Sequence, residues 1–393
     1  MTRPLAGLRV VDFTHVLAGP ACAYHLGLLG AHVTKVESPR GDAMRHRGGT
    51  DPDRAARGMS TAYVTQAAGK RSVVLDLETD AGRGAMDDLL AGADVFVENH
   101  RPATLRRLGL DWDRLRDRHP RLVHCAMTGY GRGHRLEDAP AYDVNIQAAS
   151  GLMALTGTQE TGPMRVGAPV IDYATALAAG FGICAALVER ERTGRGRLVD
   201  VAMMDVALTL MSSTLVDHAL TGTVPRPRGN AANSRSPSSG LFTCANGHLS
   251  LGVNEAAQFA RLARVLGRAD WLEDPRYATP EARQANGPAL STEIAACLME
   301  RSAGDWEAEM LAAGVPVARL RTPDEALAEA DRAGRPFLLD AEGEPTPNRP
   351  FRLGPDPVGI SAPESLPPPP RERASVARVP PGGDRHPSER GDG

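Results

Sequence analysis

The first 130 residues alternate short apolar runs with helical patterns, and this alternation constrains the fold more than any other feature of the sequence. Apolar runs of strand length occupy residues 8–13, 33–37, 72–77, 94–98 and 122–127, and helical patterns separate them at 21–30 and 81–90. Strands separated by helices are typical of βαβ units, whose parallel strands are buried on both faces. The sequence therefore predicts an α/β fold with a mostly parallel open sheet covered by helices.

Further along the chain, helical patterns at 142–153, 173–192 and 204–220 and a strand pattern at 198–201 extend this large domain to residue 220. Residues 221–239 are rich in Pro, Arg, Gly, Asn and Ser, a composition typical of a linker. We therefore expect the large domain to be interrupted after residue 220 by an insertion.

The insertion is predicted to be a smaller α+β domain over residues 240–313. Residues 240–253 alternate around Asn246-Gly247, which is typical of a type I′ hairpin, and helical patterns follow at 255–266, 291–301 and 305–313. Strand patterns at 314–320 and 337–340 predict a return to the large domain over 314–360. The Pro-rich, charged residues 361–393 predict a disordered tail.

The charge balance bears on possible partners. Lys and Arg number 45 and Asp and Glu number 48, which gives a formal net charge of −3, and the only lysines are Lys35 and Lys70. Without excess positive charge, neither a nucleic acid nor an anionic membrane is an expected partner. No run reaches the roughly 18 apolar residues of a membrane span, and the N-terminus shows no signal-peptide pattern. Five widely spaced cysteines without a CxxC pair indicate a reducing compartment, so we expect a cytoplasmic protein.

Residues 8–37 imitate a dinucleotide-binding unit, with a strand, a turn, a helix and a second strand that ends in an acid. The turn at Ala18-Gly19-Pro20 has one glycine where such a site needs three to let the backbone approach a pyrophosphate. An ordinary βαβ unit is therefore favoured over NAD binding.

Three side chains are candidates for chemistry on position alone. His15 and His100 follow predicted strands, where α/β proteins bind ligands, although such histidines are more often structural. Asp172 precedes a long apolar helical run and is either an N-cap or a nucleophile placed by the helix N-terminus. The histidines show no metal-ligand spacing, so no metal site is predicted.

A series of ordered motifs resembles the family III CoA-transferases (the CaiB/BaiF family), relatives of formyl-CoA transferase, carnitine CoA-transferase and α-methylacyl-CoA racemase. The motifs are Phe13 to Cys22, Leu29 to Glu37 with Gly41-Asp42, Gly69 to Ser72, Leu75 to Leu77, Val97 to Asn99 with Pro102, Gly129 to Gly131, Tyr142-Asp143, Ala149 to Leu152 and Thr193 to Gly196. They run in family order from residue 5 to about 215, and weaker matches continue to Gly314-Val315-Pro316.

The resemblance implies that Asp172 is the catalytic nucleophile. It also implies an acyl-CoA site at His15, Val16, Leu17, Ala18, Leu75, Asp76, Leu77, Glu78, Asn99, His100, Arg101, Arg107, Pro140, Ala141, Tyr142 and Asp143. The implied reaction moves CoA from an acyl-CoA to a small carboxylic acid through an aspartyl mixed anhydride and an aspartyl-CoA thioester. It needs no tightly bound cofactor, because CoA is itself a substrate. The family forms interlocked homodimers, which we expect here.

The chain departs from its relatives at three places. Formyl-CoA transferase has Gln where Leu17 stands, and its glycine-rich loop is replaced here by residues 229–234, Gly-Asn-Ala-Ala-Asn-Ser. The racemases have a proton-transferring His where this chain has Tyr142, whose ordinary pKa near 10 makes it a poor base. A CoA-transferase is therefore favoured; an acyl-CoA racemase or epimerase, or a non-catalytic acyl-CoA-binding protein, is the alternative.

Overall fold

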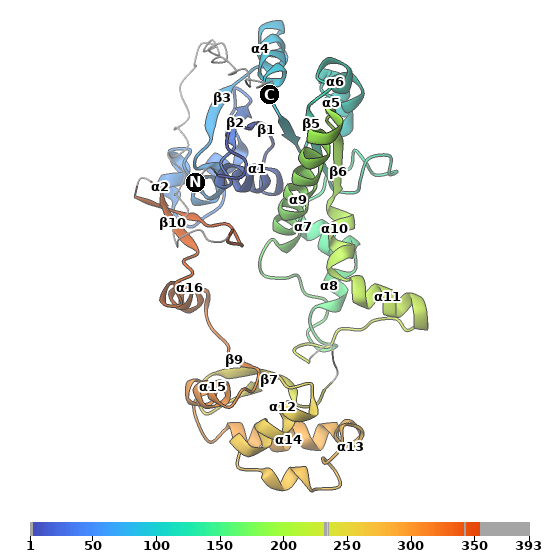
Figure 1. The fold of residues 1–393 in the computed structure, drawn as a ribbon, viewed down its shortest axis with the longest axis vertical. Helices are drawn as coiled ribbons and strands as arrows, with labels where there is room; N and C mark the ends of the chain where they lie inside the picture. Colours follow the sequence, from blue (N-terminus) through green and yellow to red (C-terminus); the bar gives the residue numbers. More distant parts are fainter. Residues whose placement is uncertain (1–2, 232–233, 235, 342, 354–393) are drawn as a thin grey trace, which may run out of the picture. The chain divides into compact units, whose positions relative to one another are not determined.

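The computed structural model describes residues 3–231, 234, 236–341 and 343–353, and its central feature is a six-stranded sheet (Figure 1). The strand order is β3-β2-β1-β4-β5-β6, and every adjacent pair is parallel. The strands are β1 (Arg9–Phe13), β2 (His32–Glu37), β3 (Arg71–Val74), β4 (Val95–Glu98), β5 (Val123–Thr128) and β6 (Leu198–Ala202). The predicted parallel sheet is confirmed, and its order reverses between β1 and β4.

Helices cover both faces of this sheet. Successive strand residues point to opposite faces, so Val10 packs in one hydrophobic cluster and Val11 in another. The first face is covered by α1 (Ala18–Leu28) and α9 (Val170–Thr193), and the second by α4 (Asp80–Ala91), α5 (Pro102–Leu108) and α6 (Trp112–Arg118). The 3₁₀ helix η1 (Ala43–His46), α2 (Pro52–Ala56) and α3 (Thr61–Ala67) lie between β2 and β3 in the chain.

Helix α9 is apolar along its whole length. Among the described residues it is the one helix whose length and composition would also suit a membrane span. Its buried side, which includes Ala176, Ala179 and Ile183, packs in the core beside the sheet, as in the core helix of a globular protein. Phe181 and Val188 lie on the other side and are 79% and 62% exposed. The helix therefore leaves one apolar face without cover in a single chain.

Two helices that the sequence predicts as continuous are each broken. The 142–153 pattern forms α7 (Asp143–Ala149) and α8 (Leu152–Leu155), because Gly151 adopts a φ of +90° that ends a right-handed helix. The 204–220 pattern forms α10 (Met203–Leu210) and α11 (Ser212–Thr221). Near that break the Ser212 hydroxyl donates to the carbonyl oxygen of Thr209 at 2.6 Å, a side-chain bond that competes with the helix ladder.

The chain separates into two compact units. Among the described residues, the first comprises those up to Leu152, Arg165–Thr223 and those from Ala333 to Leu353; the second comprises Met153–Met164 and those from Val224 to Arg332. The second unit thus includes a segment that we assigned to the large domain. The strand expected to return to that domain, β9 (Val317–Arg319), instead pairs with β8 of the second unit. The 361–393 tail and part of the 229–234 loop lie outside the described residues.

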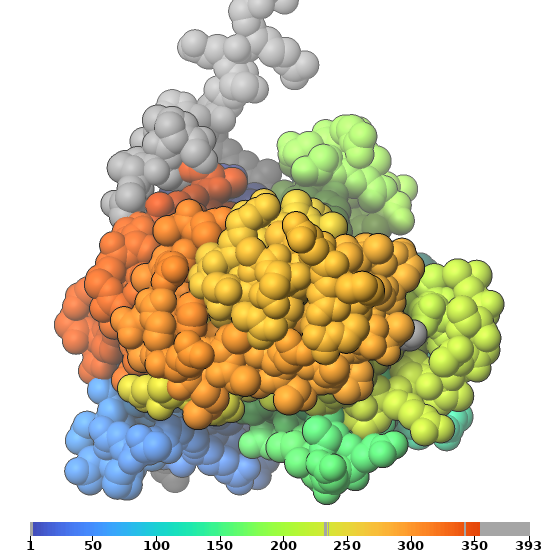
Figure 2. Space-filling view, turned by 90° about the horizontal axis from the view of Figure 1, so that it is seen from below, coloured from blue at the N-terminus to red at the C-terminus, as the bar shows by residue number. Residues whose placement is uncertain are grey.

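The second unit is built on a three-stranded antiparallel sheet. Its strands are β7 (Ser239–Thr243), β8 (His248–Gly252) and β9. Its helices are α12 (Ala256–Val265), the 3₁₀ helix η2 (Ala269–Leu272), α13 (Pro280–Ala285), α14 (Gly287–Leu298), α15 (Ala303–Ala312) and α16 (Pro323–Arg332). One hydrophobic cluster joins the sheet to α12, η2, α14 and α15, with Trp271, Leu290 and Met310 fully buried. Figure 2 shows one face of this unit, in yellow and orange.

The predicted β7–β8 hairpin forms, but its turn is not type I′. A type I′ turn needs positive φ at both central residues, whereas of Asn246 and Gly247 only Gly247 has one, at +84°. The amide of Cys244 donates to the carbonyl oxygen of Gly247 at 3.0 Å. Gly247 therefore supplies the one left-handed residue of a hairpin loop that is longer than a two-residue type I′ turn.

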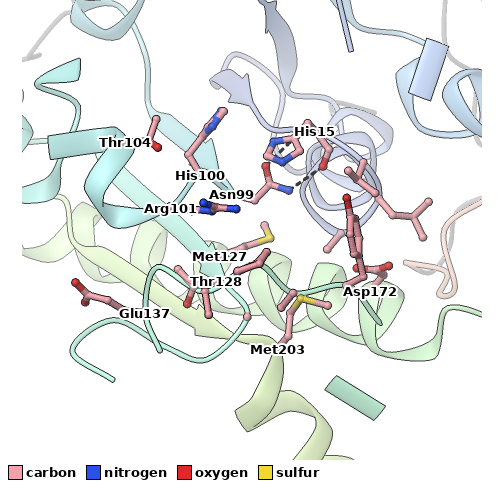
Figure 3. Close-up of a pocket in the computed structure, with 18 residues that line it drawn as sticks. His15, Asn99, His100, Arg101, Thr104, Met127, Thr128, Glu137, Asp172 and Met203 are labelled. Atoms are coloured by element: carbon pink, nitrogen blue, oxygen red, sulfur yellow. Dashed lines mark hydrogen bonds between the residues drawn. The ribbon is translucent and has the colours of Figure 1, made fainter. Parts of the chain in front are cut away.

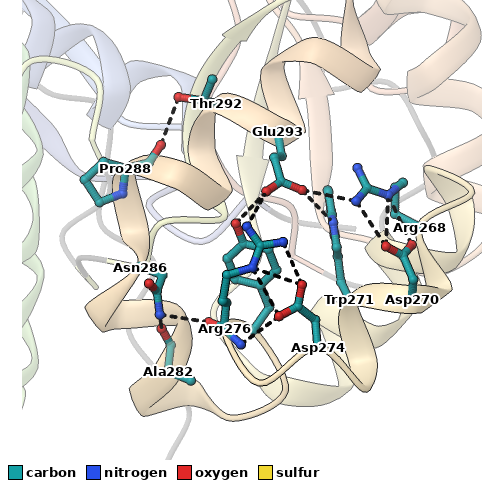
Figure 4. Close-up of polar contacts among 11 residues, drawn as sticks. Arg268, Asp270, Trp271, Asp274, Arg276, Ala282, Asn286, Pro288, Thr292 and Glu293 are labelled. Atoms are coloured by element: carbon teal, nitrogen blue, oxygen red, sulfur yellow. Dashed lines mark hydrogen bonds and ion pairs between the residues drawn. The ribbon is translucent and has the colours of Figure 1, made fainter.

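Glu293 on α14 organises a polar cluster at the edge of this second core (Figure 4). Its carboxylate accepts hydrogen bonds from Trp271 Nε1 at 3.0 Å and from the Tyr277 hydroxyl at 2.7 Å. It also pairs with Arg268 and Arg276, at 3.1 and 3.2 Å. One acid thus satisfies the polar ends of two core aromatics.

The chain re-enters the first unit as a short antiparallel hairpin, β10 (Leu338–Ala341) and β11 (Glu344–Pro347). This hairpin is tied to α1, because the Tyr24 hydroxyl donates to the carbonyl oxygen of Pro347 at 2.6 Å. Tyr24 and Pro347, which are more than 300 positions apart in the sequence, are therefore in direct contact.

Candidate active site

A pocket of about 340 Å³, here called the central pocket, lies where the strand order reverses, beyond the carboxyl ends of β1, β4 and β5 (Figure 3). Ligands of open parallel sheets bind at such a reversal. Most of the predicted site residues line it: His15, Val16, Leu17, Ala18, Asn99, His100, Arg101, Pro140, Ala141, Tyr142 and Asp172. The topology thus brings three separate segments and the candidate nucleophile together.

The remaining predicted residues do not line this pocket. Leu75 and Leu77 are buried in the hydrophobic cluster between the sheet and α4, α5 and α6, outside the pocket lining. Glu78 and Arg107 form an exposed ion pair with each other at 2.8 Å. Asp76 also lies outside the lining, and Asp143 is buried behind it.

The pocket also contains residues that the sequence analysis did not predict: Thr104, Met127, Thr128, Gly129, Glu137, Ala139 and Met203. Gly129 had a signal, because it belongs to a quoted motif. A Cβ added there would lie 2.4 Å from the Cβ of Ala141, so only glycine allows the 139–142 loop to pass this closely. Glu137 and Met203 lie in no recognisable pattern and reach the pocket only through the fold.

The turn between β1 and α1 has a strained backbone. Val16 has a φ of +68°, which is rare for a β-branched residue. Asn99, at the end of β4, holds this turn from both sides: its Oδ1 accepts from the His15 amide at 2.9 Å, and its Nδ2 donates to the His15 carbonyl oxygen at 2.8 Å. Such strain is maintained only where the surroundings over-determine it, and it is concentrated at functional sites.

Both lysines of the sequence support this turn from inside the protein. Lys35 donates to the carbonyl oxygen of Thr14 at 2.9 Å and pairs with Asp42 at 3.0 Å. Lys70 pairs with Asp12 at 2.7 Å and donates to the carbonyl oxygen of Pro20 at 2.8 Å. The two lysines are 1% and 3% exposed, so these buried charges are compensated within the protein. Together they fix the backbone on either side of Val16.

Asp172 lies in the first turn of α9 and is not its N-cap, because the helix begins at Val170 and Pro169 occupies the cap position. The capping acceptor comes from α7. Asp143 Oδ2 accepts from the amide of Ile171 at 2.7 Å and from the amide of Asp172 at 3.2 Å. Asp143 is thus an acceptor for the start of α9, and Asp172 is left facing the pocket.

The surroundings of Asp172 change its acidity. Burial and, to a smaller extent, the negative charge of Asp143 raise the pKa of Asp172 from 3.8 to about 7. A carboxyl group that titrates near neutrality in a pocket is typical of a functional residue. At neutral pH it is therefore present both as acid and as carboxylate.

Two histidines lie at another wall of the pocket, where His100 stacks on Phe13 and the His15 ring is tilted against it. The His100 ring lies 4.1 Å from the ring of Phe13 and 5.0 Å from that of His15. Burial, with a contribution from His15, lowers the pKa of His100 to about 3, so its imidazole is neutral at physiological pH. Arg101 therefore supplies the positive charge at this wall.

Comparisons with known proteins bear on this geometry. The model of CoA-transferase family III matches residues 5–368. The succinate–glutarate CoA-transferase of Agrobacterium fabrum is 33% identical over 344 residues, which cover 87% of this chain and 86% of that protein. The succinyl-CoA–D-citramalate CoA-transferase of Chloroflexus aurantiacus is 33% identical over 338 residues, covering 86% and 83%. The crystal structure of a CaiB/BaiF family protein from Brucella suis is 31% identical, with a TM-score of 0.81 over 94% of this chain and 96% of that one.

Proposed function

This chain belongs to CoA-transferase family III, and on that premise we propose that Asp172 carries CoA as an enzyme thioester during transfer between carboxylic acids. The observation that supports this role is the position of Asp172, a partly buried carboxyl group in the central pocket with a pKa near neutrality.

In the proposed reaction the Asp172 carboxylate attacks the thioester carbonyl of the acyl-CoA. The C–S bond breaks, which gives a mixed anhydride and the CoA thiolate. The thiolate then attacks the aspartyl carbonyl, forms the aspartyl-CoA thioester and releases the donor acid as its carboxylate. The acceptor carboxylate attacks this thioester, and the released thiolate attacks the acceptor's carbonyl in the new anhydride, which restores Asp172.

Each attack creates a negatively charged oxygen that needs hydrogen-bond donors. Helix α1 begins at Ala18 in the pocket wall, and the first amides of a helix have no partner within the helix. We propose that these amides, held by the strained turn at Val16, stabilise the tetrahedral intermediates. Asn99 is then a positioning residue, because it fixes the turn that carries the donors.

The acyl-CoA site is proposed to follow the pocket wall from the 15–18 turn to residues 99–101 and 140–142. Arg101 provides a charge for a phosphate group, and the His15 and His100 rings, whose pKa values are both lowered by burial, provide uncharged aromatic contacts. The relatives named above use dicarboxylic acids, which supports small carboxylic acids as donor and acceptor here.

We further propose a cytoplasmic homodimer. The exposed apolar residues of α9 and α11 support self-association, since Phe181, Val188 and Leu220 are 62–82% exposed in one chain. All five cysteines are free, which is compatible with a reducing compartment. Sedimentation velocity would test the dimer, and a monomer at micromolar concentration would contradict it.

The direct test of Asp172 replaces it with Ala. Transfer from a panel of acyl-CoA donors to a panel of carboxylates, followed by mass spectrometry, should fall by roughly three orders of magnitude. Asp205→Ala, which removes a carboxylate from the first turn of α10 outside the pocket lining, is the matched control. In the native protein hydroxylamine should trap the aspartyl thioester and change the mass of the peptide that contains Asp172. Full transfer activity in a folded Asp172→Ala protein would refute the proposed mechanism.

A further inference from the structure

A second cavity in the first unit, here called the side cavity, has no role in the reaction described so far. It has a volume of about 670 Å³ and lies between α1, α3, the start of α9 and the β10–β11 hairpin. Its walls are mainly apolar and include Ala21, Val64, Leu177, Phe337 and Pro347. A concave, apolar cavity of this size is typical of a site for an organic ligand.

The side cavity lies next to the central pocket along two helices. Leu17, the N-cap residue of α1, lines the central pocket, and Ala21 and His25, about one and two turns further along the helix, line the side cavity. On α9, Asp172 lines the central pocket and the next residue, Tyr173, lines the side cavity. The Leu17 and Tyr173 positions therefore mark the boundary between the two spaces.

Nine of the seventeen residues that line the side cavity have polar side chains, and most of these are hydrogen-bonded or ion-paired within the protein. The Tyr173 hydroxyl already accepts a hydrogen bond from Gln66 Nε2 at 3.2 Å, and Arg54 is paired with Glu344 at 2.8 Å. His25 Nδ1 is buried without a hydrogen-bond partner among the described residues, and burial lowers the pKa of this ring, which keeps it neutral. The cavity thus offers no unpaired cation for a second carboxylate.

We propose that the side cavity receives the hydrocarbon tail of the acyl group, and that the preferred substrates are aliphatic monocarboxylic acids and their CoA thioesters. The inference rests on the proposed function of Asp172, because the tail must enter the side cavity while its carbonyl carbon is at Asp172. It distinguishes this chain from the relatives named above, whose dicarboxylic acids would place a charged group against apolar walls.

The first test measures kcat/KM for butyryl-, hexanoyl- and octanoyl-CoA, and for succinyl-CoA, with one fixed acceptor acid. Each buried methylene should raise kcat/KM about fourfold until the cavity is filled. Succinyl-CoA should be poorer than butyryl-CoA, which has the same number of acyl carbons. A flat or falling series in an active enzyme, or a preference for succinyl-CoA, would overturn the proposal and leave the role of Asp172 intact.

The second test changes the cavity wall. Leu177→Asp should lower kcat/KM for octanoyl-CoA by roughly tenfold or more and leave acetyl-CoA within about twofold, because only the tail meets the new charge. The control is Leu311→Asp, the same substitution at an exposed site on α15 of the second unit. This variant should show the same dependence of kcat/KM on acyl chain length as the native protein. Leu177→Trp fills the cavity without adding a charge and should lower kcat/KM for octanoyl-CoA in the same way. It replaces Leu177→Asp in the test if that variant does not fold.

A third measurement does not depend on turnover. Calorimetric titration of the native protein with octanoate should show binding that Leu177→Asp weakens and Leu311→Asp leaves unchanged. Leu177→Asp could instead dissociate the dimer and leave the dependence of kcat/KM on chain length unaltered. In that case the face of α9 that contains Leu177 binds a second copy of the chain, and the proposal is wrong. If no acyl-CoA supports transfer while octanoate still binds, the proposed function fails and the cavity remains a site for aliphatic acids.

Discussion

Replacing Asp143 with Asn removes the negative charge beside Asp172 and keeps the size of the side chain. The two causes together raise the pKa of Asp172 from 3.8 to about 7, and Asp143 is the smaller of them. Its removal should therefore lower this pKa by at most about half of the rise, roughly 1 to 1.5 pH units. The pKa falls because the ionised form of Asp172 no longer lies beside a like charge.

The assay is the pH profile of kcat/KM for CoA transfer, whose acid limb reports the nucleophile of the free enzyme. Activity should rise with a midpoint near pH 7 in the native protein and about one unit lower in Asp143→Asn. The rate at high pH should also fall, roughly ten- to a hundredfold, because an amide oxygen is a weaker acceptor than a carboxylate for the amides of Ile171 and Asp172.

The other ionisable groups that line the central pocket are His15, His100, Arg101, Glu137 and Tyr142, and none of them contributes to the shift at Asp172. Asp205→Asn is the control, since it removes a carboxylate from the neighbouring α10 and should leave the midpoint in place. A profile of Asp143→Asn with a lower plateau and an unmoved midpoint would refute the electrostatic argument and reduce Asp143 to a structural cap.

Three other predictions concern stability and specificity. Asp172→Asn should stabilise the protein at pH 8 by at most about 4 kcal/mol, and not at pH 4, as urea denaturation would show. The folded-state pKa of Asp172 is raised, so the native protein loses stability as its carboxyl ionises between about pH 4 and pH 7. Identical urea denaturation curves of variant and native protein at pH 8 would contradict this. Tyr142→Phe should keep most transfer activity, and 2-methylacyl-CoA in deuterium oxide should show no α-proton exchange; rapid exchange would favour a racemase. Glu293→Gln should destabilise the second unit by about 1 kcal/mol without changing the affinity for acyl-CoA, and an unchanged thermal midpoint would show the cluster to be dispensable.

The sheet was predictable because its signal is local. Buried parallel strands appear as apolar runs, and the runs at β1, β2, β4 and β5 agree with the structure to within one or two residues. The helix breaks at Gly151 and Met211 were not predicted, since the apolar pattern continues across both. Glycine conformation and side-chain bonding decide those breaks, and neither changes hydrophobic periodicity.

The site was predictable only where a motif stands next to a strand end. Asp172 was placed correctly at the start of a helix, but its interpretation as a cap failed because the capping acceptor, Asp143, comes from another helix. That pairing depends on tertiary structure and leaves no trace in spacing. The side cavity is further out of reach of sequence reasoning, since Ala21 and Pro347 meet there only after the chain has completed the second unit and returned.

The burial of both lysines has a chemical consequence for an enzyme that handles thioesters. Acyl-CoAs acylate free amines without any catalyst, and the neutral ε-amino group of an exposed lysine is their usual protein target. In this chain arginine, whose guanidinium stays protonated, takes every other cationic position, while Lys35 and Lys70 are held as ion pairs inside the fold. The folded enzyme therefore offers its own substrate no lysine side chain to modify, and lysine acylation would mark molecules that have unfolded.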